Sequence, residues 1–164
     1  MHQYPLPTVS EVLQTASGGK LFSKIDLDDA YLQVELDDES RKYVVFTTQK
    51  CIFRVNRLAF VLAAVPAIFQ SIIEQILRPV PRTQPYLDDV LVTGDTEQQH
   101  IENLRQYFMK LRAPGIRLKR VKCKFFLHEV EHPGHVIDAN GVRPSPSNAR
   151  AIPETPAPID LKSS

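Results

Sequence analysis

Two adjacent aspartates, Asp88 and Asp89, interrupt a run of apolar residues that favour β-structure. Tyr86 and Leu87 precede the pair, and Val90-Leu91-Val92 follows it. An ionised carboxylate is costly inside a strand unless it is paired or binds a cation. The pattern therefore predicts a tight hairpin that carries two carboxylates at its tip. Pairs of aspartates are also common in ordinary turns, so the pair by itself leaves a purely structural interpretation open.

A third aspartate, Asp26, ends a second apolar stretch, Leu21 to Leu27, which we expect to be a buried strand. If the two strands are neighbours in one sheet, the carboxylates of Asp26 and Asp88 converge. Magnesium takes oxygen ligands and is commonly held by one or two carboxylates together with substrate phosphates. Two such ions about 4 Å apart can assist phosphoryl transfer. Ordinary turn or solvent-exposed aspartates remain the alternative.

Hydrophobic periodicity predicts strands and helices in alternation, with local hairpins, which is typical of an α+β fold. A first helix ends at Gly18-Gly19, and Leu32 to Leu36 alternates like a half-buried strand. Gln49-Lys50 is expected to turn one hairpin and Ala139-Asn140-Gly141 another. Two longer helices are expected over Ala63–Leu77, with Pro66 in its first turn, and after Thr96, with Gln99 completing a capping box.

Composition constrains function only loosely. The 164 residues suffice for one domain. The net charge of +1 gives no indication of nucleic-acid binding. Locally, Arg112 to Lys124 contains six basic residues and no acid, which on charge alone indicates a solvated strand face. The prolines cluster after position 143, so residues 145–164 are expected to be a Pro-rich tail or linker.

Cys51 and Cys123 have no metal-ligand spacing, and we expect both to be reduced core residues. We expect a cytoplasmic or nuclear protein that is not secreted, because no signal peptide follows Met1. The longest apolar run, Ala59 to Phe69, is too short to span a bilayer, so no membrane partner is expected.

Several blocks resemble the motifs of reverse transcriptases, in the family's order and spacing across nearly the whole chain. Tyr86-Leu87-Asp88-Asp89 resembles the Tyr-x-Asp-Asp signature, and the Phe22–Tyr31 segment resembles the strand that holds the first catalytic aspartate. The remaining blocks are Tyr4-Pro5-Leu6-Pro7, Leu58-Ala59-Phe60-Val61-Leu62, Pro66-Ala67-Ile68-Phe69-Gln70, Lys122-Cys123-Lys124-Phe125, Gly134-His135-Val136-Ile137 and Gly141-Val142-Arg143-Pro144. The variant most similar to this chain is the Gypsy class of long-terminal-repeat retrotransposons.

The resemblance implies the palm of a right-hand polymerase, with an antiparallel sheet, helices on one face, partial fingers and no thumb. Residues 1–144 would form the palm and partial fingers, and residues 145–164 would lead toward a missing thumb and ribonuclease H region. The implied reaction is RNA- or DNA-templated DNA synthesis on a primer–template from deoxynucleoside triphosphates. The implied cofactor is Mg²⁺ or Mn²⁺, with two ions expected only when nucleotide is bound. An integrase region would also belong to the parent polyprotein.

The resemblance also implies roles for individual residues. Asp26, Asp88 and Asp89 would be the catalytic and metal-binding acids, joined by the Leu27 carbonyl. The nucleotide would be bound by Leu27, Ala30 through its backbone N–H, Tyr31 as a steric gate beneath the sugar, Phe60 and Lys122, with Lys122 protonating pyrophosphate. The primer grip would comprise His132, Pro133, Gly134 and His135, and the basic run would contact the nucleic-acid backbone.

The chain departs from the family pattern at several scaffold positions. These are Cys51, Ala59, Val61, Val65, Pro79, Arg82, Pro85 and Pro133. Pro85 is expected to break the ladder of its strand, because it has no N–H. Three functions therefore stay open: a working nucleotidyltransferase, an inactive module that binds nucleic acid or protein, and a fossil product with no selected role.

Overall fold

A four-stranded antiparallel sheet forms the centre of the fold. The computed structural model describes residues 4–5, 7–59, 64–132 and 134–146. The strand order is β4 (Thr83–Tyr86), β5 (Asp89–Gly94), β1 (Leu21–Asp26) and β6 (Lys124–Leu127). The expected hairpin is therefore β4–β5, and β1 lies beside it, as the sequence predicted.

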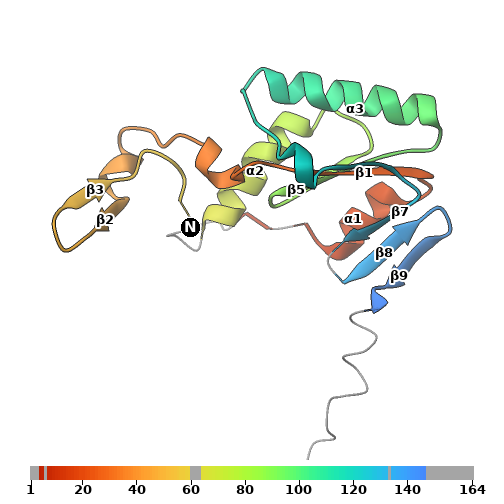
Figure 1. Ribbon diagram of the computed structural model, residues 1–164, viewed down its shortest axis with the longest axis horizontal. Helices are drawn as coiled ribbons and strands as arrows, with labels where there is room; N and C mark the ends of the chain where they lie inside the picture. The colour runs from red at the N-terminus through yellow and green to blue at the C-terminus, as the bar shows by residue number, and fades with distance from the viewer. Residues whose placement is uncertain (1–3, 6, 60–63, 133, 147–164) are drawn as a thin grey trace, which may run out of the picture.

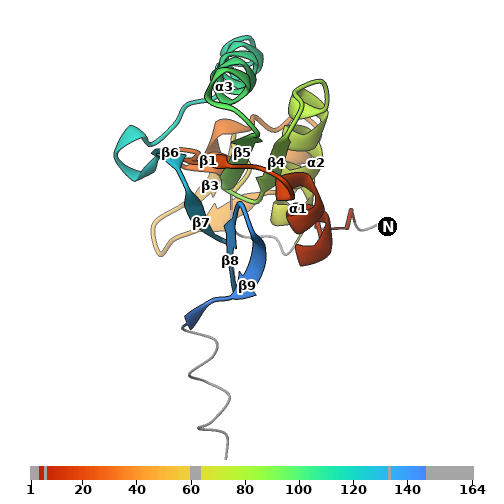
Figure 2. The same ribbon diagram turned by 90° about the vertical axis from the view of Figure 1, so that its right-hand side faces the viewer.

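Helices α2 (Val65–Leu77) and α3 (Glu97–Arg112) cover one face of this sheet, as expected (Figure 2). Pro66 lies in the first turn of α2, where a missing N–H costs nothing. The hydroxyl of Thr96 caps α3 by accepting the Gln99 N–H. The core on this face joins the helices to β1 and β5 through Ile25, Val90, Val92, Phe69, Ile73, Leu77, Leu104, Tyr107 and Leu111.

The opposite face of the sheet packs on α1 (Val9–Ala16) and on a separate three-stranded sheet (Figure 1). That sheet comprises β7 (Glu129–His132), β8 (His135–Asp138) and β9 (Gly141–Pro144), and the last turn is the predicted hairpin. A capping box between Thr8 and Glu11 begins α1. The core on this side comprises Val12, Ala16, Phe22, Leu91, Val130 and Ile137.

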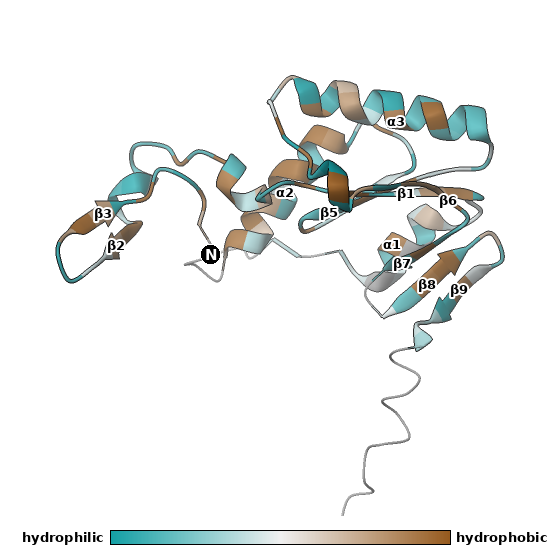
Figure 3. Cartoon of the chain, in the orientation of Figure 1, coloured by the Kyte–Doolittle hydropathy of each residue, from teal (hydrophilic) through white to brown (hydrophobic). Residues whose placement is uncertain are grey.

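The hairpin of β2 (Val45–Thr47) and β3 (Ile52–Arg54) projects away from these layers (Figure 1). Every residue of both strands is exposed, although Figure 3 shows apolar segments on them. Phe46 and Phe53 face each other across the ladder, with ring centroids 6.2 Å apart. Their stacking and the backbone ladder, rather than a buried core, hold the hairpin.

Two expected strands are wrong. The segment Leu32 to Leu36 is not a strand, because Asp29 adopts a left-handed φ of 45° and the chain then forms the 3₁₀ helix η1 (Ala30–Gln33). The helical turn buries the adjacent residues Ala30 and Tyr31 together, which an extended strand would point in opposite directions. A second 3₁₀ helix, η2 (Ser40–Lys42), precedes β2.

The basic run is not a strand over most of its length either. The helix α3 holds Arg112, a loop follows, and η3 (Arg120–Lys122) is a 3₁₀ helix ahead of β6. The expectation that both cysteines lie in the core is wrong for Cys51, which is exposed, whereas Cys123 is partly buried and packs against the core. Residues 147–164, most of the expected tail, lie outside the described residues.

The junction between the sheet and α3 leaves little free space. A Cβ atom at Gly94 would lie 2.7 Å from the His100 Cα, so only glycine fits at the end of β5. The His100 ring is fully buried and shares a hydrogen bond of 2.8 Å with the Ser23 hydroxyl.

Among the described residues, no helix has the length and apolar character needed to cross a membrane.

Candidate active site

The register of β1 against β5 brings the three candidate acids to one end of the sheet. Asp26 is the last residue of β1 and pairs with Asp89, the first residue of β5. Beyond that pair, the Leu27 N–H donates to the Asp88 carbonyl over 2.9 Å. Asp26 and Asp88, predicted to converge, consequently line one pocket of about 140 Å³.

The turn between β4 and β5 is held from behind by α2. Leu87 in this turn has a left-handed φ of 55°, a conformation that a non-glycine residue adopts at some cost. The fully buried Gln70 accepts the Leu87 N–H over 2.8 Å and donates to the Pro85 carbonyl over 2.9 Å. Gln70 belongs to one of the motifs that resemble the family, but no role was predicted for it from the sequence.

Each acid has a different electrostatic partner. Asp26, with a side chain 17% exposed, lies 3.5 Å from the Lys122 ammonium. Asp89 instead pairs with Lys24 over 2.8 Å, and it does not line the pocket. Asp88 is exposed at the pocket mouth. The three carboxylates are thus not equivalent, because Asp26 and Asp88 face the cavity while Asp89 faces Lys24.

Tyr31 forms the floor of the pocket. It is 5% exposed, and its ring packs edge-on against Phe69 at a centroid separation of 5.1 Å. Burial raises the pKa of the Tyr31 hydroxyl, and the negative charge of Asp88 raises it further. The buried Ala30 and Leu27 line the same pocket.

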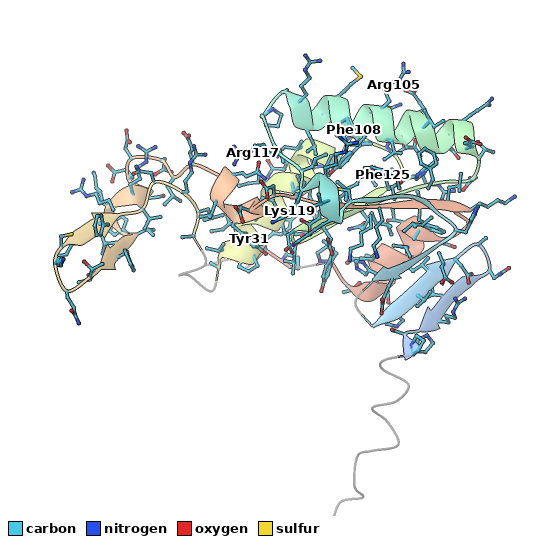
Figure 4. The ribbon with its side chains drawn as sticks, in the orientation of Figure 1. Tyr31, Arg105, Phe108, Arg117, Lys119 and Phe125 are labelled. Carbon is cyan, nitrogen blue, oxygen red and sulfur yellow. The ribbon has the colours of Figure 1, made fainter. Side chains whose placement is uncertain are left out.

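Two lysines complete the pocket wall, and one of them was not predicted. The Lys119 N–H donates to the Asp26 carbonyl over 2.9 Å, and the Lys122 N–H donates to the Lys119 carbonyl over 2.8 Å. These bonds place both side chains beside the acids, and Lys119 lies 4.0 Å from Asp28. Figure 4 shows Lys119 and Tyr31 on the same side of the molecule. The acid-free basic run indicated this segment, but its pattern did not distinguish Lys119 from the other basic residues.

The donor atoms fit a hard divalent cation only with help from a substrate. Asp26 and Asp88 offer carboxylate oxygens, which magnesium prefers. Within the described parts of the chain, however, no group of three or more His, Cys, Asp or Glu residues could hold a metal ion. Phosphate oxygens and water would have to supply the remaining ligands, as is usual for magnesium.

Of the predicted primer-grip residues that the structure describes, His132 ends β7, Gly134 lies in a turn and His135 begins β8. His132 is 5% exposed and packs edge-on against Tyr86, which begins the turn toward Asp88, at 4.9 Å. Burial lowers the pKa of His132 to about 4, helped by the positive charge of Lys24 and by His135. A cavity of about 510 Å³ is lined by Lys24 of β1, by residues of β6 and β7 including His132, and by Gly134.

Some predicted positions lie outside the described residues, namely Phe60, Val61 and Pro133. Among the other departures, Arg82 adopts a φ of 55°, which explains why a glycine suits that position. Pro85 does not break its ladder, contrary to expectation, because β4 is an edge strand. The Pro85 carbonyl points to Gln70, so the absent N–H also faces away from β5.

The family model described as "Reverse transcriptase (RNA-dependent DNA polymerase)" matches residues 1–137. The chain belongs to the reverse transcriptase family. This reverse transcriptase domain is 36% identical to an uncharacterized protein of Caenorhabditis elegans, covering 97% of the chain and 12% of that protein. It is 33% identical to the retrovirus-related Pol polyprotein of transposon 412 of Drosophila melanogaster, covering 98% of the chain and 13% of that protein.

The polyprotein of the Drosophila melanogaster transposon gypsy is 27% identical over 95% of the chain and 15% of its own length. These matches confirm a reverse transcriptase domain of the retrotransposon kind, and the chain spans about an eighth of the first curated relatives it matches. As a family, reverse transcriptases depend on divalent metal ions.

Solved structures confirm the fold. A foamy viral protease–reverse transcriptase in complex with an RNA/DNA hybrid superposes with a TM-score of 0.81 at 21% identity, covering 96% of this chain and 21% of that one. The same kind of protein in complex with double-stranded DNA gives a TM-score of 0.82 at 21% identity, covering 96% and 33%. The predicted α+β palm with part of the fingers is therefore correct.

Proposed function

We propose that the pocket bounded by Asp26, Asp88, Tyr31 and Lys122 is a nucleotidyl-transfer site for RNA- or DNA-templated DNA synthesis. The observation that carries this proposal is the pocket itself, in which three carboxylates (Asp26, Asp29 and Asp88), two lysines and a buried tyrosine converge from segments far apart in the sequence. Carboxylates on one side and cations on the other suit a metal-chelated triphosphate.

In this proposal Asp26 and Asp88, with the Leu27 carbonyl, hold Mg²⁺ or Mn²⁺, and two ions bind only with nucleotide. When bound, the ions would activate the attacking hydroxyl and stabilise the leaving oxygen. Asp89 would contribute through its charge, which Lys24 partly neutralises at 2.8 Å. Lys122 and Lys119 would neutralise the phosphates, and Lys122 would supply the proton to pyrophosphate.

The remaining residues of the proposed site orient the substrates. Tyr31 would lie beneath the sugar and exclude a 2′-hydroxyl, since its buried, Phe69-packed ring cannot move aside easily. The Ala30 N–H and Phe60 would contact the nucleotide. His132, Pro133, Gly134 and His135 would hold the primer strand, with RNA or DNA primer–templates and deoxynucleoside triphosphates as the partners.

A Mn²⁺ titration tests this proposal, with paramagnetic broadening of NMR signals as the readout. We expect weak binding without nucleotide, because the protein supplies only part of a ligand set. Broadening should centre on residues 26–31 and 87–89 and should be lost in Asp88→Asn. Asp38→Asn is the matched control, because Asp38 is exposed and forms an ion pair with the nearby Arg41, away from the pocket. Broadening that survives Asp88→Asn would sink the metal site.

A further inference from the structure

Gln70 connects helix α2 to the turn that carries Asp88. The side chain has no exposed surface, yet both ends of its amide are used. Its Oε1 accepts the Leu87 N–H and its Nε2 donates to the Pro85 carbonyl, at 2.8 and 2.9 Å. The amide therefore binds the backbone on both sides of Tyr86 and holds the turn at two points.

A third hydrogen bond fixes which way the amide points. Nε2 also donates to Glu74 over 2.7 Å, one helical turn further along α2. Because an ionised carboxylate only accepts hydrogen bonds, Glu74 keeps Nε2 on its own side and leaves Oε1 for Leu87. The Tyr4 hydroxyl also donates to Glu74. The orientation of Gln70 is thus determined by its partners rather than by chance.

The turn depends on this support for two reasons. Leu87 has a φ of 55°, so its backbone conformation is strained and must be held by its surroundings. The Pro85 carbonyl and the Leu87 N–H use Gln70 in place of a strand partner. Without the amide the Leu87 N–H would lose this partner and the Pro85 carbonyl would keep the longer bond of 3.2 Å from the Gln84 amide, so the turn would relax in the direction that restores hydration.

We propose that Gln70 is a positioning residue that fixes the Leu87–Asp88 turn and thereby sets the affinity of the pocket for a divalent metal. It acts through the backbone and touches no reacting atom. The part that concerns the metal rests on the proposed function, whereas the clamp on the turn does not. The two parts can therefore be tested separately on the same proteins.

Gln70→Met is the decisive variant, because methionine has a similar length and shape but no amide. Gln75→Met is the matched control on the same helix, since Gln75 is exposed and its amide donates to the Ser71 hydroxyl over 3.2 Å, within α2 itself. Amide hydrogen exchange reports the turn without any metal, and Mn²⁺ affinity reports the pocket. Thermal unfolding of each variant separates a local effect from a global one.

We expect exchange of the Leu87 amide to rise about tenfold in Gln70→Met, while the amides of the β1–β5 ladder keep their wild-type rates. Mn²⁺ affinity should fall by a similar factor, and Gln75→Met should match the wild type in both. Unchanged Leu87 exchange in a folded Gln70→Met protein overturns the proposal, as does a uniform rise across the ladder.

Two further outcomes are distinguishable. If the wild type binds no Mn²⁺ but Leu87 exchange still rises in Gln70→Met, the clamp stands and the proposed metal site fails. If Gln70→Met does not fold, Gln70→Glu decides, because it keeps an acceptor for Leu87 and loses the donor to Pro85. A folded Gln70→Glu protein with wild-type amide exchange throughout residues 86–88 would contradict the proposal.

Discussion

Asp26 and Asp89 face each other as the last residue pair of the β1–β5 ladder, and yet their side chains contact different lysines. Asp26 approaches Lys122 and the pocket, whereas Asp89 pairs with Lys24 outside it. Asp88, in the turn, and Asp89, the first residue of β5, are adjacent in the sequence but do not share a surrounding, since Asp88 lines the pocket and Asp89 does not. We expect metal binding to depend more on Asp26 and Asp88 than on Asp89.

Primer extension by this chain should be at or below background, even with Mn²⁺. Phosphoryl transfer depends on positioning and on neutralising the phosphates, and a small misplacement can lower the rate about a hundredfold. Among the described residues, Lys119 and Lys122 are the cations that line the pocket. Single-nucleotide incorporation on oligo-primed RNA measures this. Robust extension that Asp88→Asn abolishes would contradict the prediction and favour a working enzyme over an inactive module.

Tyr31 should ionise above the ordinary tyrosine pKa of about 10. Burial is the larger cause and Asp88 the smaller, so Asp88→Asn should lower the Tyr31 pKa without returning it to the ordinary value. Because the folded-state pKa is raised, stability from this group is present below pH 10 and is lost as the pH rises through that raised pKa. NMR titration of ¹³C-labelled tyrosine measures the shift, with Asp38→Asn as the control.

His132 should make the fold sensitive to acid. Its pKa is lowered to about 4, chiefly by burial, so the unfolded chain takes up a proton first when the pH falls below about 6.5. The stability it contributes is present above pH 6.5 and is lost as the pH falls toward 4. His132→Phe, which keeps an aromatic ring against Tyr86, should flatten this part of the stability curve.

Urea unfolding between pH 7 and 4 measures the effect of His132. His128→Phe is the control, because His128 is exposed and immediately precedes β7, the strand that His132 ends. A His132→Phe protein whose stability falls with pH as steeply as the wild type would show that another group carries the acid sensitivity.

Two glycines that border β1 and β5 should respond differently to alanine. A Cβ at Gly19 would lie 1.9 Å from the Thr93 hydroxyl, whereas one at Gly94 would meet the His100 backbone at 2.7 Å. Each substitution should destabilise the fold by about 1–3 kcal/mol through overpacking. Thr93→Ala should relieve Gly19→Ala but not Gly94→Ala, because a backbone clash persists whatever the side chain. Urea unfolding of the double-mutant cycles measures both couplings, and equal relief would refute the prediction.

The long, strongly periodic elements were predictable from sequence. The helices α2 and α3 and the hairpin around Asp88 could be predicted from their apolar patterns without tertiary information. The pairing of β1 with β5 was predicted because Asp26 and Asp88 were expected to converge. The capping box of Thr8 and Glu11 is legible in the sequence and was missed. The course of Leu32 to Leu36 was not predictable, because burial of Ala30 and Tyr31 overrides the local alternation.

The candidate site divides in the same way. Asp26, Asp88, Tyr31 and Lys122 belong to motifs and were predicted, but the hydrogen bonds that orient them join residues distant in the sequence. Lys119 enters the pocket because its backbone bonds to Asp26, and no pattern of residue types reports that bond. Pro85 shows the same limit, since its effect depended on which side of the ladder its missing N–H faces.

The β2–β3 hairpin has a consequence for the behaviour of the purified chain. Its apolar side chains are exposed on a two-stranded ribbon whose outer edges pair with no other strand in the described part of the chain, and such edges are a usual starting point of self-association. Residues 45–54 contain Lys50 and Arg54 and no acid, so copies of the hairpin repel one another electrostatically. Salt screens that repulsion, with a Debye length of about 8 Å at physiological ionic strength and about 3 Å at 1 M. Concentrated salt should therefore make this protein less soluble.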